Sequence, residues 1–238
     1  MSAAPDPRSR GEAEAIAAGI ATVRKRITAA CERAGRDPAT VTLIAVSKTM
    51  PVEAVAAAAR AGIVDFGENR VQEGVQKAHE LRTAGITPTW HLIGHLQTNK
   101  VRAAMGAFAI LQAVDSERLL GAIAGVASNA AAGAPVRVML EVNVSGEASK
   151  FGVAPSGLAG LLSCARSLPG ISVEGLMTVA PASSEPDEVR GVFRGLRELA
   201  AEHGLPSLSM GMSNDYELAI EEGSTHVRVG RAIFGERP

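Results

Sequence analysis

A lysine at the end of an apolar run is the first residue in this sequence that suggests covalent chemistry. Lys48 closes the stretch TLIAVSK, residues 42–48, and stands three residues before Pro51. A lone lysine at a strand end most often extends its ammonium group into solvent. If burial among Val, Ile and Ala side chains instead lowers its pKa below the usual value of about 10.4, the neutral amine can attack an aldehyde and form a Schiff base. The stretch alone leaves both interpretations open.

Two segments near the C-terminus are suited to binding an anion. GMSND, residues 211–215, places Ser213 just before a predicted helix, whose free N–H groups and positive end favour a negative charge. HVRVGRAIFG, residues 226–235, contains Gly230 and Arg231, where the backbone can approach a ligand closely and offer further amides. These segments therefore predict a phosphate site.

Arg228 adds a cation to the same region. It lies two residues before Gly230, so on a strand the two residues share a face. If that face is inward, the guanidinium of Arg228 is placed to meet a ring nitrogen. Each motif is common by itself, but their combination with Lys48 predicts an aldehyde that carries a phosphate.

These residues need a fold that brings the ends of separate strands together. Short apolar or β-branched runs alternate with longer helical stretches, which is typical of parallel βα units. The eight strand-like runs cover residues 41–48, 63–69, 89–96, 108–116, 136–144, 171–179, 207–213 and 226–235. The helical stretches cover an amphipathic opening from about Gly11 to Arg36 and then residues 52–61, 70–83, 98–107, 117–132, 155–168, 185–203 and 215–223.

The sequence predicts a single α/β domain over residues 1–238, a (β/α)8 barrel of TIM type with an additional N-terminal helix and a flexible segment at 1–10. Eight strands with interleaved helices in 238 residues fit that fold. An open doubly wound sheet is the alternative, but no G-x-G-x-x-G follows the first strand. In a barrel the polar residues at the C-terminal strand ends, Lys48 and Asn69 among them, meet at one mouth.

Composition and charge exclude several classes of function. The formal net charge is −1 and the pI is near 6.5, so nothing attracts nucleic acid or anionic lipid overall. The N-terminus lacks the order of a secretory signal, and no segment is an apolar span of membrane length. Cys31 and Cys164 lie far apart without C-x-x-C spacing, which favours buried thiols in a reducing compartment. We expect a cytoplasmic protein.

Two further patterns are weaker. His91 and His95 form H-x-x-x-H, but on a strand they would lie about 13 Å apart, so we assign no metal and expect a structural or cofactor-adjacent position for His91. The loop NVSGEASKFGV, residues 143–153, follows the fifth strand. A solvated loop is the ordinary interpretation, yet its Lys150 would lie at the same mouth and is a candidate for a cofactor or phosphate contact.

Five separated motifs occur in one order: AVSKTMP, FGENRVQE, WHLIGHLQTNK, GLMT, and SMGMSND with AIEEGSTHVRVGRAIFG. Together they resemble the pyridoxal phosphate homeostasis proteins, relatives of the alanine racemase N-terminal domain, over nearly the whole chain. The resemblance implies a modified TIM barrel that holds pyridoxal 5′-phosphate (PLP). The cofactor-binding residues it implies are Lys48, Asn69, Ser213, Arg228, Gly230 and Arg231, with Met177, Lys150 and His91 as additional candidates.

The same resemblance implies a position for each group of the cofactor. Lys48 would carry PLP as a Schiff base with Asn69 beside it, and Arg228 would face the pyridine nitrogen. The phosphate would be held by Ser213 with the residues at 230 and 231. Position 231 departs from the family pattern, because arginine stands where related sequences often have threonine. A backbone amide contact survives that change, whereas a hydroxyl contact does not.

The family is described as binding and supplying PLP and balancing vitamin B6 pools, without an established reaction, so the resemblance implies a carrier with little or no turnover. Apo-enzymes that require PLP are then possible recipients. A racemase is the alternative. A racemase of this type would continue past the position of Pro238 into a second domain, which forms the dimer interface and lends a tyrosine across it. We therefore expect a monomer here. A class I aldolase, with an imine from lysine to substrate, is the third interpretation.

Overall fold

The computed structural model describes residues 7–128, 134–181 and 185–236 of the chain. The predicted flexible segment 1–10 falls partly outside these residues, because 1–6 are not described. The first helix begins at Pro7 and runs to Arg33, and the flexibility of this segment stays a prediction.

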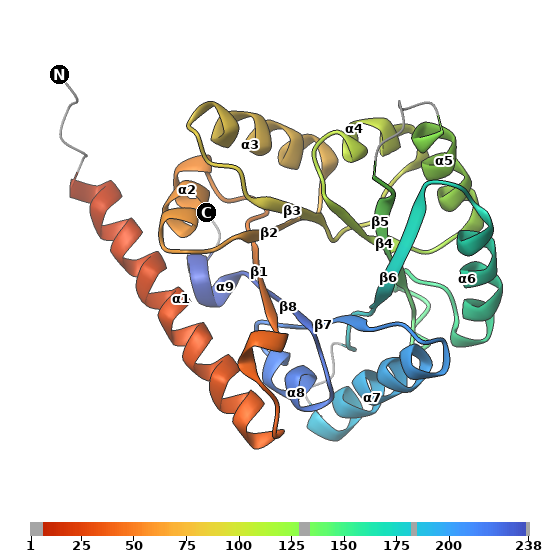
Figure 1. Ribbon diagram of the computed structural model, residues 1–238. Helices are drawn as coiled ribbons and strands as arrows, with labels where there is room; N and C mark the ends of the chain where they lie inside the picture. Colours follow the sequence, from red (N-terminus) through yellow and green to blue (C-terminus); the bar gives the residue numbers. More distant parts are fainter. Residues whose placement is uncertain (1–6, 129–133, 182–184, 237–238) are drawn as a thin grey trace.

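Eight parallel strands close into a barrel in sequence order, with the last strand paired to the first. Figure 1 looks into this ring of strands and shows the helices arranged around it. The TIM-type barrel with an N-terminal helix is therefore confirmed. The strands are β1 Thr42–Val46, β2 Asp65–Glu68, β3 Thr89–Leu92, β4 Ile110–Val114, β5 Val136–Glu141, β6 Ile171–Met177, β7 Ser207–Met212 and β8 His226–Val229.

The α-helices follow the strands in the expected order. They are α1 Pro7–Arg33, α2 Val52–Arg60, α3 Val71–Thr83, α4 Val101–Met105, α5 Glu117–Ala127, α6 Leu158–Ser167, α7 Pro186–Glu202, α8 Tyr216–Glu221 and α9 Arg231–Phe234. Short 3-10 turns, η1 Pro38–Thr40, η2 Thr98–Lys100 and η3 Pro155–Gly157, precede β1, α4 and α6. Within the described ranges, no helix combines the length and the apolar character needed to cross a membrane.

Some element boundaries differ from the prediction. The run 226–235 is not one strand, because β8 ends at Val229 and α9 begins at Arg231. The predicted helix 117–132 ends at Ala127, and residues 129–133 lie outside the described part of the chain. Helix α1 ends at Arg33 instead of Arg36, and Gly35 turns the chain with a φ of 64°.

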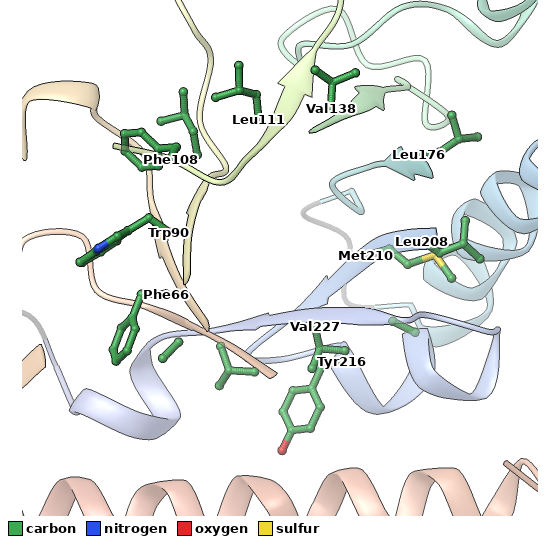
Figure 2. Close-up of a cluster of buried hydrophobic side chains, with 14 of the residues drawn as sticks. Phe66, Trp90, Phe108, Leu111, Val138, Leu176, Leu208, Met210, Tyr216 and Val227 are labelled. Carbon is green, nitrogen blue, oxygen red and sulfur yellow. The ribbon is translucent and has the colours of Figure 1, made fainter. Parts of the chain in front are cut away.

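Alternate residues of each strand face opposite sides of the barrel wall. The outward-facing side chains pack against the surrounding helices and form the main hydrophobic core, which includes Phe66, Trp90 and Leu111 (Figure 2). A separate, smaller apolar cluster of Ile110, Ala113, Met139 and Met177 comes from β4, β5 and β6. Buried polar side chains, among them Gln112, Ser209 and Arg228, also lie in the interior and lead to the site.

Helix α1 packs on the outside of the barrel, beside α2, α8 and α9 (Figure 1). Ile16, Ile20, Val23 and Ile27 are buried, and their spacing places them in one apolar stripe that faces the barrel helices. Ion pairs add to this contact at the C-terminal half of the helix. Arg33 Nε donates to Glu221 of α8 over 2.7 Å and its NH2 to Glu217 over 3.0 Å. The additional helix is thus part of the barrel's packed structure.

Candidate functional site

A cleft of about 840 Å3 opens at the C-terminal ends of the strands. The chain segments that follow β1, β2, β3, β6, β7 and β8 contribute to it, together with the loop after β5. Its lining residues are Val46, Lys48, Asn69, Ile93, Lys150, Val179, Ala180, Pro181, Pro186, Val189, Met212, Ser213, Asn214, Asp215, Leu218, Arg228, Gly230 and Arg231. Seven of the nine residues named from the sequence are therefore brought together in one cleft.

Lys48 reaches the cleft because of the alternation along β1. Val46 and Lys48 both line the cleft, whereas the intervening Ser47 is fully buried on the outer side of the barrel wall. Four lining residues are cationic, Lys48, Lys150, Arg228 and Arg231, and one is acidic, Asp215. This excess of positive charge suits an anionic ligand.

Ser213 lies in a tight turn between β7 and α8. The amide of Met212 donates to the Asp215 carboxylate, and the amide of Asp215 donates to the Met212 carbonyl over 3.0 Å. Burial raises the pKa of Asp215, against the bond from Met212. Across the turn, the amide of Gly230 donates to Ser213 Oγ over 3.4 Å. This long hydrogen bond places a hydroxyl and a backbone N–H next to each other in the cleft lining.

Asn69 is held at the cleft by a close approach between two chain segments. A Cβ at Gly94, after β3, would lie 2.5 Å from the carbonyl oxygen of Asn69. Only glycine leaves enough room there, so the loop after β3 can pass directly behind Asn69. The position of Asn69 therefore depends on the segment after β3 as well as on its own strand, β2.

Lys150 connects the loop after β5 to the segment after β6. Its ammonium group donates to the carbonyl of Ala180 over 2.6 Å and of Val179 over 3.3 Å, and it pairs with Glu147 over 3.1 Å. These bonds fix the loop at the mouth.

Arg228 lies at the floor of the cleft, 4% exposed. Its NH1 donates to Ser209 Oγ over 2.7 Å, and its NH2 donates to the Thr178 carbonyl over 2.8 Å. Burial lowers the pKa of Arg228 to about 10, while the charges of Glu141 and Asp215 oppose that shift. The guanidinium therefore stays charged at neutral pH and is held in one orientation.

A chain of hydrogen bonds continues from Arg228 across the barrel interior, and its directions follow from the arginine. Because a guanidinium only donates, Ser209 Oγ must accept from it and donate its own proton to Gln112 Oε1, 2.6 Å away. Gln112 Nε2 then donates to His91 Nδ1 over 2.9 Å. His91 Nε2 in turn donates to Asp65 over 2.9 Å at the opposite end of the barrel.

Comparison with known proteins assigns the chain to a family. A model of the alanine racemase N-terminal domain matches residues 20–238. A pyridoxal phosphate homeostasis protein of Pseudomonas aeruginosa is 45% identical over 224 residues, which cover 93% of this chain and 96% of that protein. The chain belongs to the pyridoxal phosphate homeostasis family.

Solved structures agree with this family assignment. A protein of unknown function from Bifidobacterium adolescentis is 37% identical, with a TM-score of 0.89 over 98% of each chain. The family member PipY of Synechococcus elongatus, solved with PLP bound, is 36% identical, with a TM-score of 0.80 over 92% of this chain and all of that one.

Two residues that the family motifs suggested lie outside the cleft lining. Met177 belongs to the small apolar cluster inside the barrel. His91 is buried in the hydrogen-bond chain below Arg228, and the nearby His95 instead lies 3.4 Å from Asp115 and stacks on Phe151. Among the described residues, no three His, Cys, Asp or Glu side chains gather as a metal site.

Other residues of the site were missed from the sequence. Gln112 interrupts the apolar run of β4, and this interruption was the one available signal that a polar side chain faces inward. Glu141 ends β5, two residues after the inward-facing Met139, and is 7% exposed. Burial, together with the charge of Asp115, raises the pKa of Glu141 to about 7, against the influence of Arg228.

The hydrogen-bond chain predicts a cost for removing its central member. Gln112→Leu leaves the Ser209 hydroxyl without its acceptor and His91 Nδ1 without its donor, both in the barrel interior. Because each unpaired buried polar group costs about 1–3 kcal/mol, the free energy of unfolding should fall by about 2 kcal/mol or more in urea denaturation. The control is Gln76→Leu on the exposed face of α3, where the amide bonds only to exposed Glu80. Equal losses in the two variants would contradict this account.

The pKa of Glu141 predicts a pH-dependent difference between the wild type and Glu141→Gln. The folded protein keeps the Glu141 proton up to about pH 7, whereas the unfolded chain releases it near its ordinary pKa of 4.5. The favourable contribution is therefore complete below pH 4.5 and lost as pH rises through 7. Relative to the wild type, the free energy of unfolding of Glu141→Gln should rise by about 2–3 kcal/mol across this window.

The comparison with the wild type removes the opposite contribution of His226. Burial, together with the neighbouring His91, lowers the pKa of His226 to about 4, so its contribution to stability is lost as pH falls. That contribution is present in both proteins and cancels in the difference. Glu32→Gln on the exposed face of α1 is the control, and a flat difference for Glu141→Gln would show that the carboxyl is not perturbed.

Proposed function

We propose that this protein binds PLP in the cleft at the barrel mouth, attached through Lys48, and serves in vitamin B6 homeostasis as a carrier without turnover. The observation that carries the proposal is the lining of one cleft by an amine, a buried guanidinium and a serine hydroxyl next to a glycine amide. These groups fit an aldehyde, a ring nitrogen and a phosphate, respectively. The PLP-bound state of the relative PipY supports the same ligand.

Lys48 provides the covalent attachment in this proposal. Its amine would hold the cofactor by an imine to the aldehyde carbon, with the aldehyde oxygen released as water. Asn69 lies in the same lining and would contact the ring side. Position 46, two residues earlier on the same strand face, supplies an apolar wall beside the amine.

Ser213, Gly230 and Arg231 hold the phosphate in this proposal. Ser213 Oγ and the Gly230 amide lie next to each other, joined by a long hydrogen bond, and Arg231 begins α9, where N–H groups lack helical partners. The side chain of Arg231 is exposed, so its contribution to the phosphate site is assigned to the backbone amide. Lys150, whose ammonium group is already bonded to loop carbonyls, remains a secondary candidate.

Arg228 faces the ring nitrogen in this proposal, and Met177 and His91 lie behind it. When bound, PLP supplies an electron-withdrawing ring that can stabilise negative charge on an attached substrate carbon. A guanidinium that stays protonated does not deliver a proton to the ring nitrogen, so Arg228 weakens that capacity. An arginine in this place favours holding the cofactor over using it.

The absence of turnover is also supported by the position of the single tyrosine. A racemase needs a second acid or base on the opposite side of the substrate carbon from the lysine. Tyr216 is 1% exposed, and Figure 2 shows its ring pointing from α8 toward α1. The guanidinium of Arg26 on α1 lies 5.3 Å from the ring centroid. Tyr216 therefore faces away from the cleft.

Reduction with borohydride tests the covalent attachment. Wild-type protein mixed with PLP should show a visible absorption band that hydroxylamine removes, and borohydride should fix the cofactor on the peptide containing Lys48, as read by mass spectrometry. Lys48→Ala should lose both signals, while Lys25→Ala on the exposed face of α1 should keep them. A reduced adduct on the Lys48→Ala protein would refute the attachment. A colourless wild type that instead traps a carbonyl substrate would favour an aldolase.

Deuterium exchange tests the absence of turnover. PLP-loaded protein incubated with L-alanine in D2O should leave the Cα proton in place, as monitored by NMR, because the cleft offers no tyrosine to complete a two-base reaction. An alanine racemase serves as the positive control under the same conditions. Rapid appearance of deuterium at Cα would make the racemase the better proposal.

A further inference from the structure

The backbone that carries Lys48 forms a strained turn. The amide of Met50 donates to the carbonyl of Ser47 over 3.0 Å, which closes a four-residue turn with Lys48 at its second position. At the third position Thr49 has a φ of 66°, in the left-handed region. Such a turn normally has glycine there, and a β-branched residue in this conformation is strained. Surrounding contacts must therefore hold the turn.

Those contacts come from behind the barrel wall. Lys77 projects from α3 and donates to the carbonyl of Ser47 over 2.6 Å. The same ammonium group binds Glu68 of β2 over 2.8 Å and Glu73 of α3 over 2.7 Å. Glu73 also accepts from the amide of Thr49 over 2.6 Å. The carbonyl before Lys48 and the amide after it are thus both bonded to one group of charges.

Glu68, Glu73 and Lys77 form what we call the turn clamp. Glu68 is fully buried, Lys77 is 6% exposed, and Ser47 Oγ donates to Glu68 over 2.7 Å. Burial raises the pKa of Glu68, against the bonds from Lys77 and Ser47. Burial also raises that of Glu73, but the bonds from Lys77 and Thr49 outweigh it and leave its pKa below the ordinary value.

The clamp does not belong to the cleft itself. Its three members are not among the residues described as lining the cleft, and Glu73 and Lys77 instead lie beside a separate shallow pocket with Thr49 and Met50. A buried group of charges is weak evidence for stability, because desolvation offsets the attraction between the charges. Directional bonds to both neighbours of Lys48 are better explained by a requirement for geometry.

We propose that Glu73 and Lys77, supported by Glu68, are positioning residues that hold the strained turn so that Lys48 points at the aldehyde carbon of PLP. The inference rests on the proposed function. A relaxed turn would let the amine occupy more positions, and a displacement of about 1 Å at a reacting group can cost about a hundredfold in rate. The clamp would therefore govern how fast the protein takes up its cofactor.

Glu73→Ala is the variant that tests the clamp. It removes the acceptor of the Thr49 amide but leaves Lys77 bonded to Glu68 and Ser47, so the buried cation keeps a carboxylate and the protein should fold. Because the strained turn then loses the bond at Thr49, the rate of covalent loading of apo-protein with PLP should fall about tenfold, which corresponds to about 1.4 kcal/mol. Glu80→Ala, the same change on the exposed face of α3, is the matched control.

Rescue by glycine separates positioning from general stability. In the double variant Glu73→Ala/Thr49→Gly, the turn forms without strain, so loading should recover by about threefold or more over Glu73→Ala. Hydrogen exchange of the apo-protein, read by mass spectrometry on the peptide spanning residues 45–52, should be faster in Glu73→Ala and unchanged in Glu80→Ala. This second readout does not depend on PLP.

The clamp would be overturned by a loading rate in Glu73→Ala equal to the wild type, with or without a lower melting temperature, or by an equal loss in Glu80→Ala. Failure of glycine to restore loading would also overturn it, because the strain would then be irrelevant. A wild type that forms no reducible bond at Lys48 would instead refute the proposed function. The two failures are therefore distinguishable.

Discussion

The closure of eight parallel strands is the constraint on which the rest of the structure depends. Closure sends every C-terminal strand end to one mouth, and it gives each strand an inner and an outer face. At the end of β1 this alternation separates neighbouring residues completely: Lys48 enters the cleft, while Ser47 is buried against α3. The backbone at the end of β1 can therefore be held from the outer side of the barrel while the side chain of Lys48 lies in the cleft.

The interior of the barrel shows how a charge can be kept at the floor of such a cleft. An unpaired buried ion costs several kcal/mol, so Arg228 is tolerable only with acceptors in place. Ser209 and the Thr178 carbonyl supply them. Gln112 and His91 continue the hydrogen-bond chain from Ser209 to Asp65 at the far end of the barrel. Apolar side chains could fill the same space, but they would not hold the guanidinium of Arg228 in one orientation.

Much of the fold could be predicted from the sequence, because alternation of short apolar runs and helical stretches is a local property. The residues of the cleft could be named because each lies at or beside a predicted strand end. The run 226–235 was misjudged for a physical reason. Its Val, Ile and Phe residues favour a strand, but the chain turns at Gly230, and residues 231–234 form α9 and bury Ile233.

Contacts that depend on three-dimensional register could not be predicted. Ser209 and Gln112 are 97 residues apart, and only barrel closure brings them within 2.6 Å. Glu73 and Lys77 stand four residues apart on a helix, a spacing that usually indicates a solvated surface pair. Their actual partners, the backbone at Ser47 and Thr49, are set by the packing of α3 behind β1.

The turn clamp and the hydrogen-bond chain of Arg228 would position groups at opposite ends of the same proposed ligand. On the outer side, Glu68, Glu73 and Lys77 bond the turn beside the amine that would attach the cofactor. On the inner side, the hydrogen-bond chain orients the guanidinium that would face its ring nitrogen. Precise placement at both ends favours tight and specific holding, whereas a protonated guanidinium in place of a carboxylate disfavours carbanion chemistry on the ring. In the proposed site, the combination of these two properties would favour carrying PLP over catalysis with it.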